Sequence, residues 1–320
     1  MKKFRVIFCV LILYIFAVSA SAAEFLIPGG QVIGLELQDN TVTIASFHEQ
    51  LGENAKKAGL QEGDRILRIN NKTVTCANHV REALKDKTGK IQVWVMRNGK
   101  TKQLSVQPVS TADGPKLGIY LKQGTTGVGT VTYYDPTDGS FAALGHGVNT
   151  KNGSLLQLRS GSIYSAKVLC VKKGAVGTPG QLMGQLTSGE SLGAICKNTA
   201  QGVFGTLASR VSADALPIAE PSQVKTGAAT IRSTVDGDSL QEYSVEILKI
   251  YPNSSERTRN MLIRVTDPKL LETTGGIVQG MSGSPIIQDG KLVGAVTHVL
   301  VNDPTTGYGI FIENMLDAAA

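Results

Sequence analysis

Residues 280–285 read Gly280-Met281-Ser282-Gly283-Ser284-Pro285, and an apolar strand, a turn at Asp289-Gly290 and a second strand over Leu292–His298 follow. The glycine two residues before Ser282 allows a sharp turn, in which the backbone N–H groups of Gly280 and Ser282 point at one position. A hydroxyl beside two converging N–H donors can attack a carbonyl group while the donors stabilise the oxyanion that forms. The stretch therefore predicts a nucleophile turn that leads into a β-hairpin.

The competing interpretation of this turn is a nucleophile elbow, Gly-x-Ser-x-Gly. An elbow needs a strand before it, a helix after it and glycine at the fifth position, where this chain has Ser284. Ser284 precedes Pro285 and is better placed to begin the next strand. A Gly-x-Ser-Gly turn that feeds a hairpin is instead typical of chymotrypsin-like proteases, which predicts a pair of β-barrels.

A serine nucleophile needs a general base, and four histidines are candidates: His48, His79, His146 and His298. The first two fall in the amino-terminal half and are expected at the surface. His146 follows an apolar strand end and stands between two glycines, which leave its ring room to reach a second barrel. The 136 residues between His146 and Ser282 suit a base in the first barrel and a nucleophile in the second. His298 ends the strand beyond the serine, where it either lines a cleft or simply packs.

The acidic partner of the base is left open by the spacing. In a usual two-barrel enzyme the acid lies between the barrels, about midway from base to nucleophile. That position favours Asp214, Asp236 or Asp238, and spacing alone does not choose among them.

The composition supports a mainly β fold. Glycine is abundant at 36 residues, aromatic residues make up 5%, and short apolar runs alternate with turn residues. Residues 117–320 are therefore predicted to form the double β-barrel. The strands expected there are Gly127–Tyr134, Ser140–Leu144, Ser162–Val171, Gly193–Cys196, Ser244–Ile250, Met261–Val265, Ser284–Ile287, Leu292–His298 and Tyr308–Ile312.

Residues 24–109 are predicted to form a separate α+β module, followed by a polar linker over 110–116. Gly59-Leu60-Gln61-Glu62-Gly63-Asp64 runs into an apolar strand, and this pattern resembles the bacterial PDZ domain. The resemblance implies a peptide site where a glycine-rich loop binds a carboxylate and the next strand edge pairs with the peptide. By position that site would comprise Gly30, Val32, Ile33, Gly34 and Leu35. The alternative is that these glycines only make a turn.

Residues 1–23 are predicted to be a signal peptide or a signal anchor. Lys2, Lys3 and Arg5 precede an apolar run and a small-x-small cleavage pattern, Ala20-Ser21-Ala22. Export permits a disulfide between Cys170 and Cys196, although an unpaired Cys76 argues against an obligatory disulfide framework. Without Lys2, Lys3 and Arg5 of the signal, about +3 of the net charge of +6 remains, and it is spread thinly along the chain, so no nucleic-acid surface is expected. No metal or organic cofactor is implied, because the cysteine spacings fit no zinc site.

The order of these motifs resembles the SpoIVB family, the stage IV sporulation protein B serine peptidases. The resemblance rests on Tyr133-Tyr134-Asp135-Pro136, Leu144-Gly145-His146, Lys197-Asn198-Thr199 and the 280–285 turn, behind a PDZ-like segment. It implies a catalytic triad of His146, Asp267 and Ser282. Asp267 has a second interpretation, because Asp followed by Pro268 is also a good helix start.

The family resemblance also implies a biological role. It implies cleavage of a membrane-associated regulator between the forespore and mother-cell membranes, which releases processing of the late mother-cell sigma factor. Self-processing near the amino terminus is implied as well, and the PDZ ligand would be a peptide or the enzyme's own amino-terminal region. The alternatives are a non-catalytic extracytoplasmic PDZ adaptor and a general envelope quality-control protease. Such quality-control enzymes place the PDZ module after the protease domain.

Overall fold

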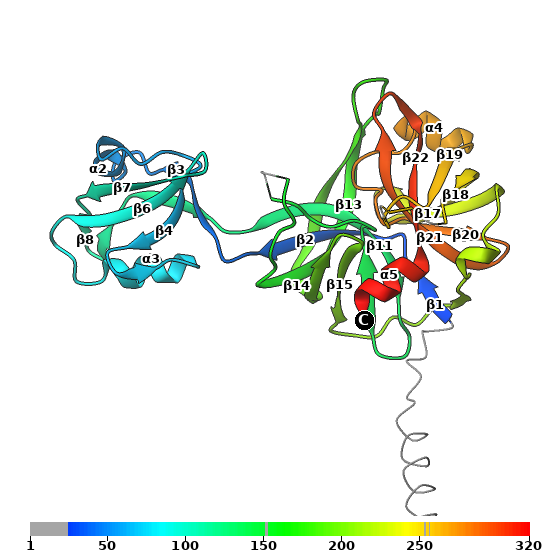
Figure 1. Ribbon diagram of the computed structural model, residues 1–320, viewed down its shortest axis with the longest axis horizontal. Coiled ribbons are helices and arrows are strands. Elements are labelled where there is room, and N and C mark those ends of the chain that lie inside the picture. Colours follow the sequence, from blue (N-terminus) through cyan, green and yellow to red (C-terminus); the bar gives the residue numbers. More distant parts are fainter. Residues whose placement is uncertain (1–24, 151–152, 253, 256) are drawn as a thin grey trace, which may run out of the picture.

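The computed structural model describes residues 25–150, 153–252, 254–255 and 257–320. The predicted signal segment, 1–23, lies outside the described residues. In the part of the chain that is described, no helix combines the length and the apolar character needed to cross a membrane. Strands dominate, and they form two closed barrels and a smaller sheet (Figure 1), so the predicted mainly β, chymotrypsin-like fold is confirmed.

The first barrel closes through six antiparallel strands, in the order β12-β15-β14-β13-β2-β11 and back to β12. Its long hairpin, β13–β14, extends well beyond the barrel. Two short strands, β1 and β16, extend the sheet beside β11. The bounds are β1 Phe25–Pro28, β2 Val32–Gln38, β11 Thr125–Tyr134, β12 Ser140–Ala143, β13 Ser160–Lys172, β14 Gln181–Thr199, β15 Gly202–Leu207 and β16 Leu216–Pro217.

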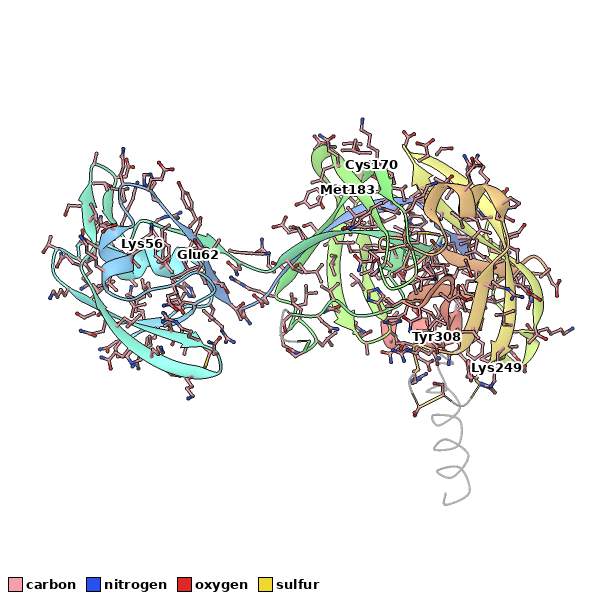
Figure 2. All side chains as sticks on the ribbon, turned by 90° about the horizontal axis from the view of Figure 1, so that it is seen from above. Lys56, Glu62, Cys170, Met183, Lys249 and Tyr308 are labelled. Atoms are coloured by element: carbon pink, nitrogen blue, oxygen red, sulfur yellow. The ribbon has the colours of Figure 1, made fainter. Side chains whose placement is uncertain are left out.

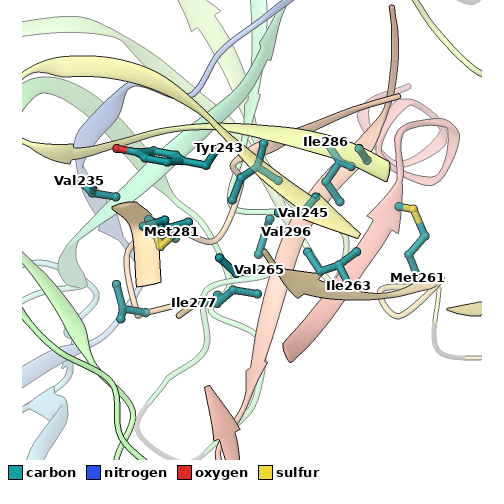
Figure 3. Close-up of a cluster of buried hydrophobic side chains, with 14 of the residues drawn as sticks. Val235, Tyr243, Val245, Met261, Ile263, Val265, Ile277, Met281, Ile286 and Val296 are labelled. Carbon is teal, nitrogen blue, oxygen red and sulfur yellow. The ribbon is translucent and has the colours of Figure 1, made fainter. Parts of the chain in front are cut away.

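The second barrel is closed in the order β17-β18-β19-β22-β21-β20. Alternate residues point inward, as in β19, where Met261, Ile263 and Val265 are buried and form part of the apolar core (Figure 3). The bounds are β17 Gly227–Asp236, β18 Ser239–Ile250, β19 Met261–Val265, β20 Pro285–Gln288, β21 Lys291–Leu300 and β22 Asp303–Phe311, with η1 Pro221–Gln223, α4 Pro268–Thr274 and α5 Ile312–Ala319 outside the barrel.

The PDZ module is a third unit, with its own core and the sheet order β10-β3-β4-β6-β7. Its fully buried Asp64 accepts two hydrogen bonds from Arg97 at 2.6 Å each, so the Gly-Asp turn is held by an enclosed ion pair. The bounds are β3 Val42–Phe47, α2 Glu53–Lys57, β4 Arg65–Ile69, β5 Lys72–Thr73, α3 Ala77–Leu84, β6 Ile91–Arg97, β7 Lys100–Val106, β8 Val109–Thr111, β9 Gly114–Lys116 and β10 Ile119–Lys122.

The structure corrects the predicted boundaries of this module, 24–109 and the linker 110–116. Strands β1 and β2 pair with β11, and β2 also pairs with β13, so residues 25–38 belong to the first barrel. The PDZ sheet instead takes β10 as its edge strand, paired with β3. The predicted linker is the β8–β9 hairpin. The PDZ module is thus an insertion between two barrel strands, β2 and β11, which join it in Figure 1.

The predicted peptide loop is corrected for the same reason. Gly30, Val32, Ile33, Gly34 and Leu35 are all buried, and β2 has a partner strand on both of its edges. The Gly30 carbonyl accepts hydrogen bonds from the N–H and hydroxyl of Thr234 in the second barrel. This loop therefore joins the two barrels and has no free edge for a peptide. The glycine-rich sequence was ambiguous because a strand pattern does not say which sheet the strand enters.

The three described cysteines are free thiols. Cys170 pairs with Met183 near the far end of the β13–β14 hairpin, and both side chains lie there in Figure 2. Cys196 lies at the opposite end of β14, 13 residues from Met183, which is a separation of roughly 40 Å along an extended strand. A disulfide needs Cα atoms within about 7 Å, so Cys170 and Cys196 do not pair in this fold.

Candidate active site

A cleft of about 530 Å³ lies where the two barrels meet. Both Ser282 and His146 line it, together with His298 and the predicted oxyanion donor Gly280. One wall is formed by β2 and by the start of β11, the two strands that carry the PDZ insertion. The structure therefore brings together the predicted nucleophile, base and oxyanion donor, which lie up to 136 residues apart in the sequence.

The nucleophile turn needs its glycines for conformational and steric reasons. Gly280 and Gly283 have φ angles of +101° and +98°, in the left-handed half of the map that favours glycine. A Cβ atom on Gly283 would lie 2.1 Å from the Thr130 carbonyl oxygen and 2.5 Å from the Leu144 nitrogen. The turn of the second barrel is thus pressed directly against the backbone of the first.

Thr130, on β11, holds the nucleophile turn from the first barrel. Its hydroxyl donates to the Gly280 carbonyl at 2.7 Å, and its N–H donates to the Ser282 carbonyl at 3.3 Å. Thr130 is fully buried. With both carbonyl groups bound on this side, the turn is fixed in one orientation. Among the described residues no acceptor binds the N–H of Gly280 or of Ser282, so both remain available as oxyanion donors.

The β13–β14 hairpin supports the same turn from a second direction. Gln279, the residue before Gly280, exchanges backbone hydrogen bonds with Gly180 and Leu182 at 2.9 and 2.8 Å. The Leu182 side chain lies against Gly280, where a Cβ atom would be 3.0 Å away. The first barrel therefore contacts the turn through both β11 and this hairpin.

The Ser282 hydroxyl donates to the Thr297 carbonyl of β21 at 2.7 Å. No hydrogen bond joins it to His146 among the described residues. Catalytic hydrogen bonds are often long or poorly aligned before substrate binds, so this geometry does not exclude His146 as the base. The serine is half-buried, so it is open to the cleft.

His146 enters the cleft because the chain turns sharply after β12. Leu144 has φ +73° and Gly145 has φ +66°, and a branched residue held in this left-handed region is strained by roughly 1–2 kcal/mol. The His146 Nδ1–H donates to the Gly147 carbonyl at 3.0 Å. This hydrogen bond leaves Nε2 unprotonated, which is the tautomer a general base requires. Burial lowers the pKa of His146, and the Gly147 carbonyl opposes that shift.

Asn198 fixes the loop that follows His146. Its side-chain amide donates to the carbonyls of Val148 and Leu156, and its side-chain oxygen accepts from the Val148 N–H, all within 2.9 Å. Asn198 lies near the end of β14, at the turn that precedes β15. Asn198 belongs to the family motif Lys197-Asn198-Thr199. Its contact with the loop after His146 could not be read from the sequence, because the two segments meet only in the folded barrel.

Asp267 is not brought to His146. Its carboxylate accepts hydrogen bonds from the Leu270 N–H at 3.0 Å and the Ser244 N–H at 3.3 Å, and the residue is the N-cap of α4. Asp267 therefore begins a helix, as the second interpretation of this stretch predicted. Asp214, Asp236 and Asp238 are exposed and lie outside the cleft lining, which contains no Asp or Glu among the described residues.

Two closed β-barrels, with a serine turn and a histidine at their shared cleft and a PDZ domain attached, define a serine endopeptidase of chymotrypsin-like fold. The chain belongs to the SpoIVB peptidase S55 family, whose model matches residues 113–316. A PDZ domain model matches residues 32–107 and thus includes β2, which the structure places in the first barrel.

Solved structures of a mycobacterial protease are similar to this chain at low identity. The active form of the Rv3671c protease from M. tuberculosis is 15% identical, with a TM-score of 0.38, over 60% of this chain and 72% of that one. The inactive form is 14% identical, with a TM-score of 0.35, over 59% and 81%. No curated protein sequence matches this chain.

Proposed function

We propose that Ser282 is the nucleophile and His146 the general base of this endopeptidase, with the N–H groups of Gly280 and Ser282 as the oxyanion hole. The observation that carries this proposal is their convergence in one cleft between the barrels. In that cleft the base holds an unprotonated Nε2 and the two backbone donors have no other acceptor among the described residues.

The reaction then follows the chemistry of acyl transfer. The Ser282 oxygen bonds to the carbonyl carbon of the substrate peptide as its proton passes to Nε2 of His146. The carbonyl oxygen becomes an oxyanion, which accepts hydrogen bonds from the two free N–H groups. The C–N bond breaks as His146 gives the proton to the leaving amine. Water then releases the acyl group by the same steps, again with His146 as base.

Replacing the nucleophile is the direct test. Ser282→Ala should abolish peptide cleavage and labelling by a fluorophosphonate, because the other hydroxyl of the 280–285 turn, that of Ser284, is fully buried and donates to Ser233. The melting temperature should stay within a few degrees, since Ser282 is half-buried and its hydroxyl makes a single hydrogen bond, worth about 1 kcal/mol. Labelling that persists in the variant would contradict the assignment.

We infer a role in sporulation signalling, with a membrane-associated regulatory protein as the substrate. The support is membership of the SpoIVB peptidase family, the PDZ domain and the apolar, lysine-led start of the sequence. Processing of the late mother-cell sigma factor in a spore-forming host that carries only Ser282→Ala measures this role. Normal processing in that strain would exclude it, whereas complementation by the wild-type chain is the control.

Export and self-processing are part of the same proposal. The protein would act between the forespore and mother-cell membranes, either released or tethered by its amino-terminal segment. Amino-terminal sequencing of the wild type and Ser282→Ala, produced in one host, separates the possibilities. A start that differs between the two proteins indicates self-cleavage, and a shared start within residues 20–26 indicates signal peptidase.

We also propose that the PDZ peptide site lies at β10. This strand is an edge of the PDZ sheet, and Gly118 before it has φ +66°, with no space for a side chain against Leu51. Tyr120 on β10 is 55% exposed. A peptide with a free carboxylate that binds here should slow hydrogen exchange at 119–122. Protection of 32–38 without protection of β10 would contradict this placement.

A further inference from the structure

The outer part of the β13–β14 hairpin is a two-stranded ribbon that rises above the first barrel (Figure 1). β13 pairs with β2 over Ser160–Ser165, and β14 pairs with β15 over Gly193–Thr199. Beyond these ranges the two strands pair with each other. The inward face of the ribbon, with Val168 and Leu182, packs into the apolar core of the second barrel. Its outward face is left open.

The outward face and the turn of this ribbon bear large apolar side chains in the open. Leu169 is 58% exposed, Met183 52% and Val176, in the hairpin turn, 76%. The turn after β21 adds Val301, which is 49% exposed and accepts a hydrogen bond from the Gly177 N–H at 2.9 Å. We call Leu169, Val176, Met183 and Val301 the hairpin patch. Apolar side chains that gather in this way on a surface mark an interaction site.

Three lysines flank the hairpin patch. Lys167, Lys172 and Lys173 are exposed, and none of them takes part in an ion pair within the described part of the chain. Residues 160–189 contain no Asp or Glu. Asp303, two residues after Val301, accepts hydrogen bonds from two threonine hydroxyls of β22. The patch therefore combines protruding apolar side chains with positive charge that no neighbouring carboxylate offsets.

This combination fits an anionic lipid surface. Apolar side chains at the end of a protruding ribbon enter the interfacial layer of a bilayer without a matching groove, because lipids rearrange around them. Lysine side chains beside them reach the headgroups while their methylene groups lie against the apolar layer. Each lysine close to an anionic surface strengthens binding roughly 5-fold.

We propose that the hairpin patch is a docking surface for a lipid bilayer that contains anionic headgroups. This surface is separate from the predicted signal segment at residues 1–23. The N–H of Leu182, next to Met183, donates to the carbonyl of Gln279, which lines the cleft. A docked hairpin therefore holds the cleft near the lipid surface. That consequence rests on the proposed function, whereas the docking itself does not.

The test uses two thiols that the fold exposes. Cys170 pairs with Met183 in the patch, as Figure 2 shows, and Cys196 lies at the opposite end of β14. Two full-length proteins each keep one of these thiols, with the other cysteines replaced by serine, and carry the same nitrobenzoxadiazole dye. Both proteins also carry Ser282→Ala, so that self-cleavage does not alter them. The probe is a vesicle of phosphatidylcholine, with or without phosphatidylglycerol.

We expect the dye on Cys170 to shift to the blue with vesicles that contain phosphatidylglycerol, and nitroxide-bearing lipids to quench it. The dye on Cys196 should do neither. Because both proteins have the same amino terminus, any binding through that segment is common to the two. A difference between them therefore reports on the hairpin alone.

Two sets of replacements test the chemistry of the patch with the dye on Cys170. Replacing Lys167, Lys172 and Lys173 with Gln should raise the lipid concentration for half of the response about 10-fold or more. Leu169→Ser with Met183→Ser should remove the blue shift. The matched controls are Leu192→Ser, an exposed apolar position on the same strand, and Gln at three exposed lysines of the PDZ domain, Lys85, Lys87 and Lys90. Both controls should respond like the parent protein, and melting temperatures report folding.

Several results would overturn the docking surface. One is an absent response at Cys170, and another is an equal response at Cys170 and Cys196, which would assign vesicle binding to the amino terminus. An equal response without phosphatidylglycerol, or an unchanged response in the folded patch variants, would do the same. A blue shift that grows with protein concentration without vesicles would assign the patch to a second copy of the chain. None of these results bears on Ser282 and His146, because every protein in the test lacks the nucleophile.

Discussion

At the scale of single residues, Thr130 has the largest consequence that the sequence did not reveal. It lies in a β-branched strand run, where threonine is common and carries no signal of function. Its importance follows from two hydrogen bonds to carbonyl groups 150 and 152 residues away. A neighbouring threonine, Thr132, is also fully buried, yet its hydroxyl has no partner among the described residues.

Thr130 and Thr132 give a matched prediction, because both are buried on β11 and only the Thr130 hydroxyl has a partner among the described residues. Thr130→Val keeps the shape of the side chain but leaves the Gly280 carbonyl unpaired, so we expect a loss of about 1–3 kcal/mol in unfolding free energy. The labelling rate of Ser282 should fall about 10-fold, because the oxyanion donors lose their fixed orientation. Thr132→Val should be neutral or stabilising. Chemical denaturation and fluorophosphonate labelling measure both effects, and equal behaviour of the two variants would contradict this role.

Asp267 offers a second test at this scale. Asp267→Ser keeps an oxygen that can cap α4, so it should retain stability, whereas Asp267→Ala should lose about 1 kcal/mol. If Asp267 is only a cap, both folded variants label at the wild-type rate. A large rate loss in Asp267→Ser with unchanged melting temperature would restore the triad assignment. Asp236→Ala, at an exposed site outside the cleft, is the control.

The pH dependence follows from the buried base. Because burial lowers the pKa of His146, its imidazole stays neutral to lower pH than an exposed histidine. The base form is therefore present above that lowered pKa, and activity falls as the pH drops through it. Labelling rates of folded protein should have their midpoint below pH 6.5. A midpoint above the ordinary value would contradict the buried, uncompensated base.

At the scale of elements, the β13–β14 hairpin acts as a support for the nucleophile turn. Its sequence predicts short strands, Ser162–Val171 and Gly193–Cys196, but the folded strands run over Ser160–Lys172 and Gln181–Thr199. The extension was missed because residues 181–192 are mostly polar and exposed, with little of the apolar alternation that marks a half-buried strand. These residues form a strand because they pair with β13 and with Gln279.

Two glycines of the β13–β14 hairpin, Gly180 and Gly189, test whether the hairpin supports the nucleophile turn. A Cβ atom on Gly180 would lie 2.4 Å from the Gly174 nitrogen and 2.5 Å from the Lys172 carbonyl oxygen, so Gly180→Ala forces the backbone apart. We expect a loss of about 1–3 kcal/mol and a labelling rate reduced about 10-fold, because the Gln279 pairing shifts. Gly189→Ala, on the same hairpin with open space around it, should change neither quantity.

At the scale of the whole molecule, the PDZ domain is inserted into the wall of the cleft rather than joined in series before the protease. Gln123, just before β11, links the two strands that enter and leave the PDZ domain, since its amide donates to the carbonyls of Asp39, just after β2, and Thr75, within the domain. Thr125, two residues on, pairs with Leu37 and lines the cleft. The domain is therefore connected to the active site through two strands.

This architecture makes a deletion test decisive. A chain that starts at residue 117, the predicted protease boundary, lacks β1 and β2 and should not fold, because β11 and β13 each lose a partner strand. A chain in which a short Gly-Ser turn joins Gln38 to Thr125 should fold and label at Ser282, since these ends already form a hairpin register. Circular dichroism and labelling measure both. Stable folding of the first chain would contradict the insertion.

The sequence by itself determined the fold class, the nucleophile turn and the histidine opposite it. These features are local, because glycines, turn residues and strand periodicity act over a few positions. Some strand bounds followed from the same signals, as for β19 over Met261–Val265, whereas β15 and β17 were not predicted. Only the tertiary structure decided which sheet β2 enters, whether Asp267 meets His146, and that Thr130 contacts the Ser282 turn while His298 lies beside His146. Those outcomes depend on contacts between strands far apart in the chain, and such pairings leave no pattern in the residues of either strand alone.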